Sequence, residues 1–367
     1  MKDPHASRTF FCVALVLFVA LSLAACGGSG SSTPGSTSPS AMPSEAAASP
    51  SPNWSPTMSP APIPVVKPGY KLPSFSKLKA MFAYDTSEPL QFKDLGENDW
   101  IHTNVEGVYS AREITYMSAG REVHGYLVLP EGEGPFPVVL YGIDRPTDYD
   151  APYMQAAAFA SKGYAGLLVD APAALDLPGY YTWDATQDVA TWVASVTDLR
   201  RGLDVLETLL KIDASRIGFL GNTYGGAMGA DLAGLDERIQ AYALAMVGGY
   251  VSRLGSWDTR PGGEDFFAAQ GDPPPKDAAF TRYEAQLSVV DPRHYIGHSS
   301  GASFLLLNAP HEWPAVWREE LDALIAVTPK PKTVRWFDKD LPASGRTLDG
   351  PSEAEYQDMC RWLEQNL

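Results

Sequence analysis

Cysteine is scarce in this chain, and its scarcity excludes two kinds of site. The 367 residues include three cysteines, Cys12, Cys26 and Cys360. Cys12 lies in an N-terminal stretch that resembles a leader and Cys26 directly follows that stretch, so Cys360 is the one thiol expected in the folded part. A disulfide within the folded part needs two cysteines and a cysteine-based zinc site needs several, so we expect neither.

Basic residues and histidines are also few. The chain has 28 Lys and Arg against 44 Asp and Glu, which gives a formal net charge of -16. Such an acidic surface repels nucleic acid and anionic lipid, so we expect no nucleic-acid partner. Six histidines are present, and none follows His311.

A long apolar run occurs once, at residues 9–23 (TFFCVALVLFVALSL). It is short for a membrane span but typical of a signal-peptide core, and Lys2 and Arg8 precede it. The run ends in Leu23-Ala24-Ala25-Cys26-Gly27, which resembles the bacterial lipobox. The resemblance implies that residues 1–25 are removed and that Cys26 is lipidated. The alternative is an ordinary secretory signal with an incidental cysteine.

Residues 26–66 are rich in Ser, Pro, Gly and Ala, and little in them can be buried. We therefore predict a disordered tether there. With lipidated Cys26, the tether would hold the protein at the cell membrane, on its extracytoplasmic face, with the lipid bilayer as partner. Residues 67–367 suit a single large domain.

Within this domain, apolar runs typical of strands alternate with helical periodicity. The pattern predicts helices such as 185–210 and 353–366, and eight strands at 111–118, 121–130, 137–142, 164–170, 217–220, 239–247, 304–307 and 333–337. Residues 79–94 are expected to be a lead-in on the domain surface. Alternating strands and helices predict an α/β fold with a mostly parallel sheet and right-handed crossovers.

One motif after the predicted strand 217–220 indicates chemistry. Gly221-Asn222-Thr223-Tyr224-Gly225 has the layout of G-x-S-x-G, the nucleophile elbow of α/β-hydrolases. Threonine stands at the nucleophile position. Its β-branched side chain is poorly suited to the strained backbone of an elbow.

Other segments extend the likeness. The chain resembles the α/β-hydrolase superfamily, and within it the dienelactone hydrolase and acetyl-xylan-esterase-like group, over residues 82–367. The segments that carry the resemblance are PFPVVL at 135–140, DAP at 170–172, DLRR at 198–201, RIG at 216–218, DPRHYIG at 291–297 and RWFD at 335–338. It implies an α/β-hydrolase fold, with an eight-stranded sheet flanked by helices, and an esterase-type site.

Aligned with that family, the catalytic positions are altered. Thr223 replaces the serine nucleophile, and Glu312 takes the position of the acid, although it could equally be a solvated loop carboxylate. Leu341 stands where the histidine base is expected. His311 is the remaining candidate for a substitute base, subject to geometry.

The oxyanion positions are also changed. A His-Gly pair usually opens this loop in the family, and Ile143-Asp144 replaces it here. A carboxylate at Asp144 would oppose the negative charge of the transition state if it faced the site. The second donor, the backbone N–H of Tyr224, is retained in principle.

Two further groups have alternative interpretations. Tyr180, Tyr181 and Trp183 could stack on a flat ligand such as a sugar, or pack among themselves, which we favour. His294 and His298 have the i, i+4 spacing of metal ligands on a helix, but Gly297 intervenes and no third ligand is evident. We therefore expect packing histidines, no metal site and no cofactor.

These changes lead to two hypotheses. In the first, the protein is a membrane-tethered α/β-hydrolase homologue that has lost serine-hydrolase chemistry and binds a small-molecule or peptide ligand or a partner through the inherited pocket. In the second, it is an active ester or peptide hydrolase that uses Thr223 with an unorthodox base.

Overall fold

The computed structural model describes residues 61–69, 71–98, 109–143, 150–170, 182–248, 277–308, 316–336 and 353–367. The predicted signal peptide, Cys26 and almost all of the predicted tether lie outside these residues. Across the described part of the chain, no helix is both long and apolar enough to cross a membrane.

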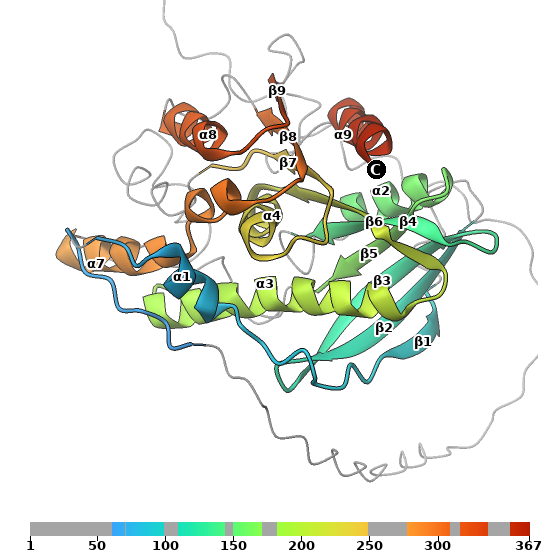
Figure 1. The fold of residues 1–367 in the computed structure, drawn as a ribbon, viewed down its shortest axis with the longest axis horizontal. Helices are drawn as coiled ribbons and strands as arrows, with labels where there is room; N and C mark the ends of the chain where they lie inside the picture. Colours follow the sequence, from blue (N-terminus) through green and yellow to red (C-terminus); the bar gives the residue numbers. More distant parts are fainter. Residues whose placement is uncertain are drawn as a thin grey trace, which may run out of the picture. The chain divides into compact units, whose positions relative to one another are not determined.

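A single twisted sheet organises the described residues (Figure 1). Its strand order is β1-β2-β3-β5-β4-β6-β7-β8-β9. The strands β1 to β3 pair antiparallel and β3 is antiparallel to β5, whereas all pairs from β5 to β9 are parallel. The strands are β1 Lys93–Glu97, β2 Tyr109–Ser118, β3 Arg121–Pro130, β4 Phe136–Gly142, β5 Ala165–Val169, β6 Ile212–Asn222, β7 Ala241–Ala245, β8 Ser303–Asn308 and β9 Lys332–Trp336.

The predicted count of eight strands is wrong by one. The additional strand, β1, falls partly in the segment expected to be a surface lead-in. Its sequence KDLGE has no apolar alternation, and its residues are largely exposed because it pairs on one side only, with β2. Its pairing with β2, rather than any pattern in its own side chains, places it in the sheet. The other eight strands confirm the prediction, with boundaries that shift by up to five residues.

Helices cover both faces of the sheet. On one face lie α1 Phe75–Met81, α3 Ala185–Thr208, α4 Thr223–Leu235 and α7 Asp277–Leu287, whose apolar residues share one core cluster (Figure 1). On the other face lie α2 Asp150–Ala160 and α9 Glu353–Asn366, which form a second cluster. The helix α8 Val316–Val327 contributes Leu324 to the first cluster. Short 3-10 turns at Ser288–Val290 (η2), Pro292–His294 (η3) and Ile296–His298 (η4) precede β8.

The inner strands are buried on both faces, which explains their continuous apolar runs. In β5 and β7 every residue is buried. In β2 and β3, by contrast, buried and less buried positions mix, because these strands lie towards the edge. In parallel sheets of this kind, ligands bind at the carboxyl ends of the strands. That edge is where β6 meets α4.

Candidate active site

The elbow is a sharp turn between β6 and α4. Strand β6 ends at Asn222 and α4 begins at Thr223, with no intervening loop. Thr223 has φ +39°, which is in the left-handed region. A β-branched residue is a rare occupant of that region, and such a conformation costs on the order of 1–3 kcal/mol. The fold therefore holds the threonine in the strained conformation expected of an elbow nucleophile.

Close backbone contact explains the glycines around Thr223. Strand β4 pairs with β6 so that Gly142 lies opposite Gly221. A Cβ on Gly225 would lie 2.2 Å from the carbonyl oxygen of Gly142, and a Cβ on Gly221 would lie 2.8 Å from Gly225. A side chain at either position would push the turn away from the sheet, so glycine is required there.

The side chain of Tyr224 packs beneath the turn. Tyr224 is buried, and its ring meets Trp192 of α3 edge-on at a centroid distance of 4.6 Å. The Trp192 Nε1–H donates to Asp231 Oδ2 of α4 at 2.6 Å. Complete burial raises the pKa of Asp231 well above its ordinary value. Helices α3 and α4 are thus joined directly behind the residue whose N–H is the candidate oxyanion donor.

Ile143 directly follows β4, with its side chain buried against the second core cluster. It therefore lies at the strand end next to β6, where the first oxyanion donor is expected. Its neighbour Asp144 lies outside the described residues.

Several predicted site residues also lie outside the described part of the chain, namely Glu312, Leu341, His311, Tyr180 and Tyr181. The structure describes the strand ends from which two of their loops start. Asn308 ends β8 and Trp336 ends β9, and the two residues are paired in register. Strand β8 is two strands from β6, roughly 10 Å away, at the same edge of the sheet.

No histidine within the described ranges is placed to serve Thr223. His124 lies on β3, three strands from β6 and so roughly 14 Å away. His294 and His298 lie in η3 and η4, at the opposite edge of the sheet. Helix α4 runs from Thr223 towards these turns. Its residue Gly234 packs against the backbone of Tyr295, and Gly234 lies eleven residues after Thr223, roughly 16 Å along the helix axis.

Trp183 is used for packing. Its ring centroid lies 5.3 Å from that of Tyr283 and 6.5 Å from that of Phe280, both on α7. A buried carboxylate fixes this region, because Asp188 accepts hydrogen bonds from the Thr182 backbone and hydroxyl and from the Tyr283 hydroxyl. For Trp183 this favours the packing interpretation over a free stacking surface.

One carboxyl group at the active edge has a perturbed pKa. Asp170 directly follows β5, and its backbone N–H donates to the His124 carbonyl. Burial raises the pKa of Asp170 to about 6, while the nearby His124 opposes the shift. This residue is absent from the sequence prediction of the site. The sequence feature that could have identified it is its position directly after a buried strand, at the start of the segment 170–172.

The arrangement matches solved structures. Acetyl xylan esterase from Paenibacillus sp. R4 superposes with a TM-score of 0.61 at 20% identity, over 80% of this chain and 93% of that chain. Acetyl xylan esterase 1 from Thermoanaerobacterium sp. JW/SL YS485 also superposes at 0.61, with 11% identity, over 82% and 96% of the two chains. The fold is that of the α/β-hydrolases. At these identities the likeness concerns the fold alone.

Sequence comparisons of this chain with the α/β-hydrolase fold point to esterases. A family model described as Esterase FrsA-like matches residues 89–258, less than half of the chain. Esterase FrsA of Enterobacter sp. (strain 638) is 34% identical over 148 residues, which cover 39% of this chain and 33% of that protein. Esterase FrsA of Escherichia coli O157:H7 is 33% identical over 142 residues, 38% and 31% of the two chains. The chain therefore spans about a third of the length of these relatives.

The family match ends at residue 258, before two of the predicted catalytic positions. It includes β4, the elbow and most of the first core cluster, and it ends before Glu312 and Leu341. The α/β-hydrolase scaffold and elbow are thus similar to those of the FrsA-like esterases, whereas the positions of the acid and the histidine are not part of that similarity. Over the described ranges, no group of three or more His, Cys, Asp and Glu side chains could hold a metal ion.

Proposed function

We propose that this α/β-hydrolase is a membrane-tethered, extracytoplasmic homologue of the esterases that binds a ligand or partner at the inherited elbow pocket without serine-hydrolase chemistry. The observation that carries the proposal is Thr223 at φ +39°. The elbow backbone is retained, but the Cβ atom that bears the Thr223 hydroxyl also bears a methyl group. Leu341 supplies no base at the histidine position. A nucleophilic hydroxyl needs an adjacent base, so the two changes act against the same step.

A fluorophosphonate probe and p-nitrophenyl acetate test the loss of chemistry. We expect no labelling of the full chain and no turnover above that of Thr223→Ala. Thr223→Ser should remain inactive, because its hydroxyl still lacks a base. The double variant Thr223→Ser with Leu341→His should be required for labelling. Labelling of the unaltered protein at Thr223 would overturn the proposal.

The second candidate is an active ester hydrolase in which Thr223 is the nucleophile and His311 or another group is the base. The preserved elbow supports it, because Thr223 keeps the strained φ that presents an elbow nucleophile. The same assay separates the candidates. Activity that is lost in both Thr223→Ala and His311→Gln, but kept in Leu341→Ala, would establish this second function.

The tether has its own test. The proposal predicts that radiolabelled palmitate is incorporated into the full chain in bacterial cells and that Cys26→Ser abolishes incorporation. A protein released from the membrane fraction without label would show that residues 1–25 are an ordinary secretory signal.

A further inference from the structure

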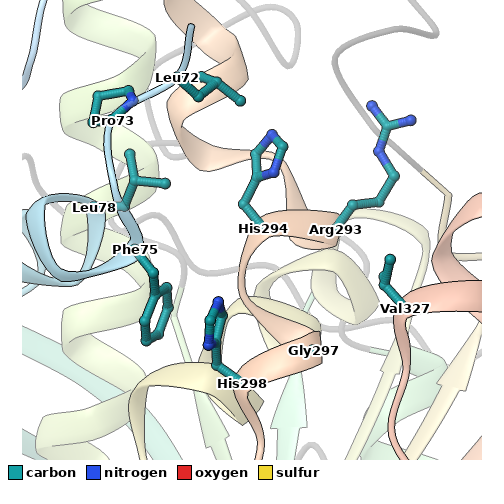
Figure 2. Close-up of a pocket in the computed structure, with 9 residues that line it drawn as sticks. All are labelled: Leu72, Pro73, Phe75, Leu78, Arg293, His294, Gly297, His298 and Val327. Carbon is teal, nitrogen blue, oxygen red and sulfur yellow. The ribbon is translucent and has the colours of Figure 1, made fainter.

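A pocket lies beside η3 and η4, the turns that hold His294 and His298 (Figure 2). It has a volume of about 330 Å³. One wall comes from residues 72–73 and α1, and the other from η3, η4 and the end of α8. The lining residues are Leu72, Pro73, Phe75, Leu78, Arg293, His294, Gly297, His298 and Val327.

The pocket combines apolar walls with nitrogen bases and has no carboxylate among its lining residues. Phe75 and His298 stack face to face, with centroids 3.6 Å apart (Figure 2). The Arg293 charge is already balanced, because its guanidinium bonds to Asp291 at 2.6 Å and lies 2.9 Å from Glu320. The imidazoles of His294 and His298 are therefore the groups that remain to donate to a ligand.

The chain segment beside the pocket is basic in an acidic protein. Residues 61–84 contain four lysines and no Asp or Glu, although acidic residues outnumber basic ones 44 to 28 in the whole chain. Lys67, Lys71, Lys77 and Lys79 are all exposed. Among the described residues, no ion pair joins them to a carboxylate. Lys71 adjoins Leu72 of the pocket wall, and Lys77 and Lys79 flank Leu78.

Apolar groups are exposed in the same region. Val65 is 80% exposed, and Val327 at the pocket wall is 42% exposed. The segment before Val66 is nevertheless held to the domain, because Gln286 of α7 bonds to the Val66 N–H and the Pro64 carbonyl at 2.9 Å each. The basic segment is therefore a fixed part of the domain surface.

We propose that this surface, the four lysines 67, 71, 77 and 79 with the His294–His298 pocket, docks the domain on anionic phospholipid and takes a glycerophosphate headgroup in the pocket. The inference rests on the proposed membrane tether, since the basic segment directly follows the predicted tether along the chain. Lysines near an anionic bilayer each contribute favourably, and the contribution decays within a Debye length. The lysines of this surface would attract anionic lipid, whereas the acidic remainder of the domain is still expected to repel it.

Vesicle flotation tests the proposal with the full chain carrying Cys26→Ser, so that the result does not depend on lipidation. The apolar run 9–23 would bind any vesicle, so the measured quantity is the ratio of binding to phosphatidylcholine vesicles with 30% phosphatidylglycerol over binding to phosphatidylcholine alone. We expect a high ratio that falls with salt and drops by about tenfold or more in Lys71→Gln/Lys77→Gln/Lys79→Gln. His298→Ala should lower it further.

The matched control removes three lysines elsewhere, Lys93→Gln/Lys162→Gln/Lys211→Gln, and should leave the ratio near that of the parent chain. Equal losses in both triple variants would show a net-charge effect and overturn the proposal, as would a ratio near one for the parent. Millimolar glycerol 3-phosphate should compete for the pocket and lower binding to the anionic vesicles; binding that it leaves unchanged would show that the pocket takes no headgroup. Failure of palmitate labelling would affect the tether alone.

Discussion

The indole N–H of Trp192 donates to Asp231 Oδ2 at 2.6 Å, inside the core and behind the elbow. The second carboxyl oxygen of Asp231 has no hydrogen-bond partner among the residues that the structure describes, and the side chain is fully buried. The acid is therefore stabilised in its neutral form. Because Trp192 also packs on Tyr224, the pair links the position of α3 to that of the elbow.

Asp231→Asn should stabilise the protein at neutral pH. Burial raises the folded-state pKa of Asp231 above that of the unfolded chain, so folding loses stability as pH rises from the unfolded pKa towards the folded one. The amide removes this loss. Denaturant titration should show a gain at pH 7 that shrinks towards pH 4. An equal gain at both pH values would contradict a neutral carboxyl group.

Trp192→Phe should destabilise the protein by about 1–3 kcal/mol, because it leaves the remaining Asp231 oxygen without its donor. The double variant Trp192→Phe/Asp231→Asn should recover part of this loss at pH 7, since the amide does not ionise and the gain from Asp231→Asn persists. The absence of any recovery would show that lost packing at Trp192, rather than the unpartnered carboxyl group, causes the loss.

Thr223→Ser should raise the free energy of unfolding by about 0.5–1 kcal/mol. The methyl group of a β-branched residue is disfavoured at φ +39°, and serine lacks it. Thr223→Val, which keeps the branch, is the control and should show no gain. A loss of stability in the serine variant would mean that the threonine methyl makes packing contacts worth more than the strain.

Gly225→Ala should destabilise the protein by about 3 kcal/mol. The added Cβ would lie 2.2 Å from the Gly142 carbonyl oxygen, a backbone atom that cannot move without displacing β4. Gly202→Ala in α3 is the matched control, because its nearest neighbour is a side-chain atom of Leu167 at 3.2 Å. Thermal unfolding should separate the two variants clearly; similar midpoints would show that the elbow can move away from β4.

Arg121→Gln should destabilise the protein more at pH 8 than at pH 4.5. Arg121 Nη2 donates to both oxygens of buried Asp198, at 3.1 and 3.0 Å. Burial raises the pKa of Asp198 to about 6, against the opposing effect of Arg121. The carboxylate is thus charged at pH 8, where we expect a loss of about 1–2 kcal/mol, and largely neutral at pH 4.5.

Arg112→Gln is the control for that experiment. Its exposed partner Asp94 has a lowered pKa, caused mainly by the hydrogen bond from Arg112, so this pair stays charged at pH 4.5. Its small effect should be similar at both pH values. Denaturant titrations at the two pH values would contradict the assignment if the Arg121 effect were independent of pH.

Much of the scaffold was predictable from local patterns. Apolar runs bounded by Gly and Pro identified the inner strands, and Ala119-Gly120, both at positive φ, marked the β2–β3 turn. Strand β1 was missed because its side chains carry no alternation and its place depends on pairing with β2. The raised pKa of Asp170 could not be predicted, because it depends on burial among residues distant in sequence.

The sequence alone determined that glycines surround one hydroxyl at the end of a buried strand, that this hydroxyl belongs to threonine and that no histidine follows His311. These conclusions need no coordinates, because they depend only on which residue types stand at these positions of the sequence. Only the tertiary structure placed Gly142 against Gly225, joined Trp192 to Asp231 and brought residues 72–78 beside 293–298 to form a pocket. Each of these pairs is far apart in the chain, so its contact is set by sheet pairing and core packing rather than by any local pattern.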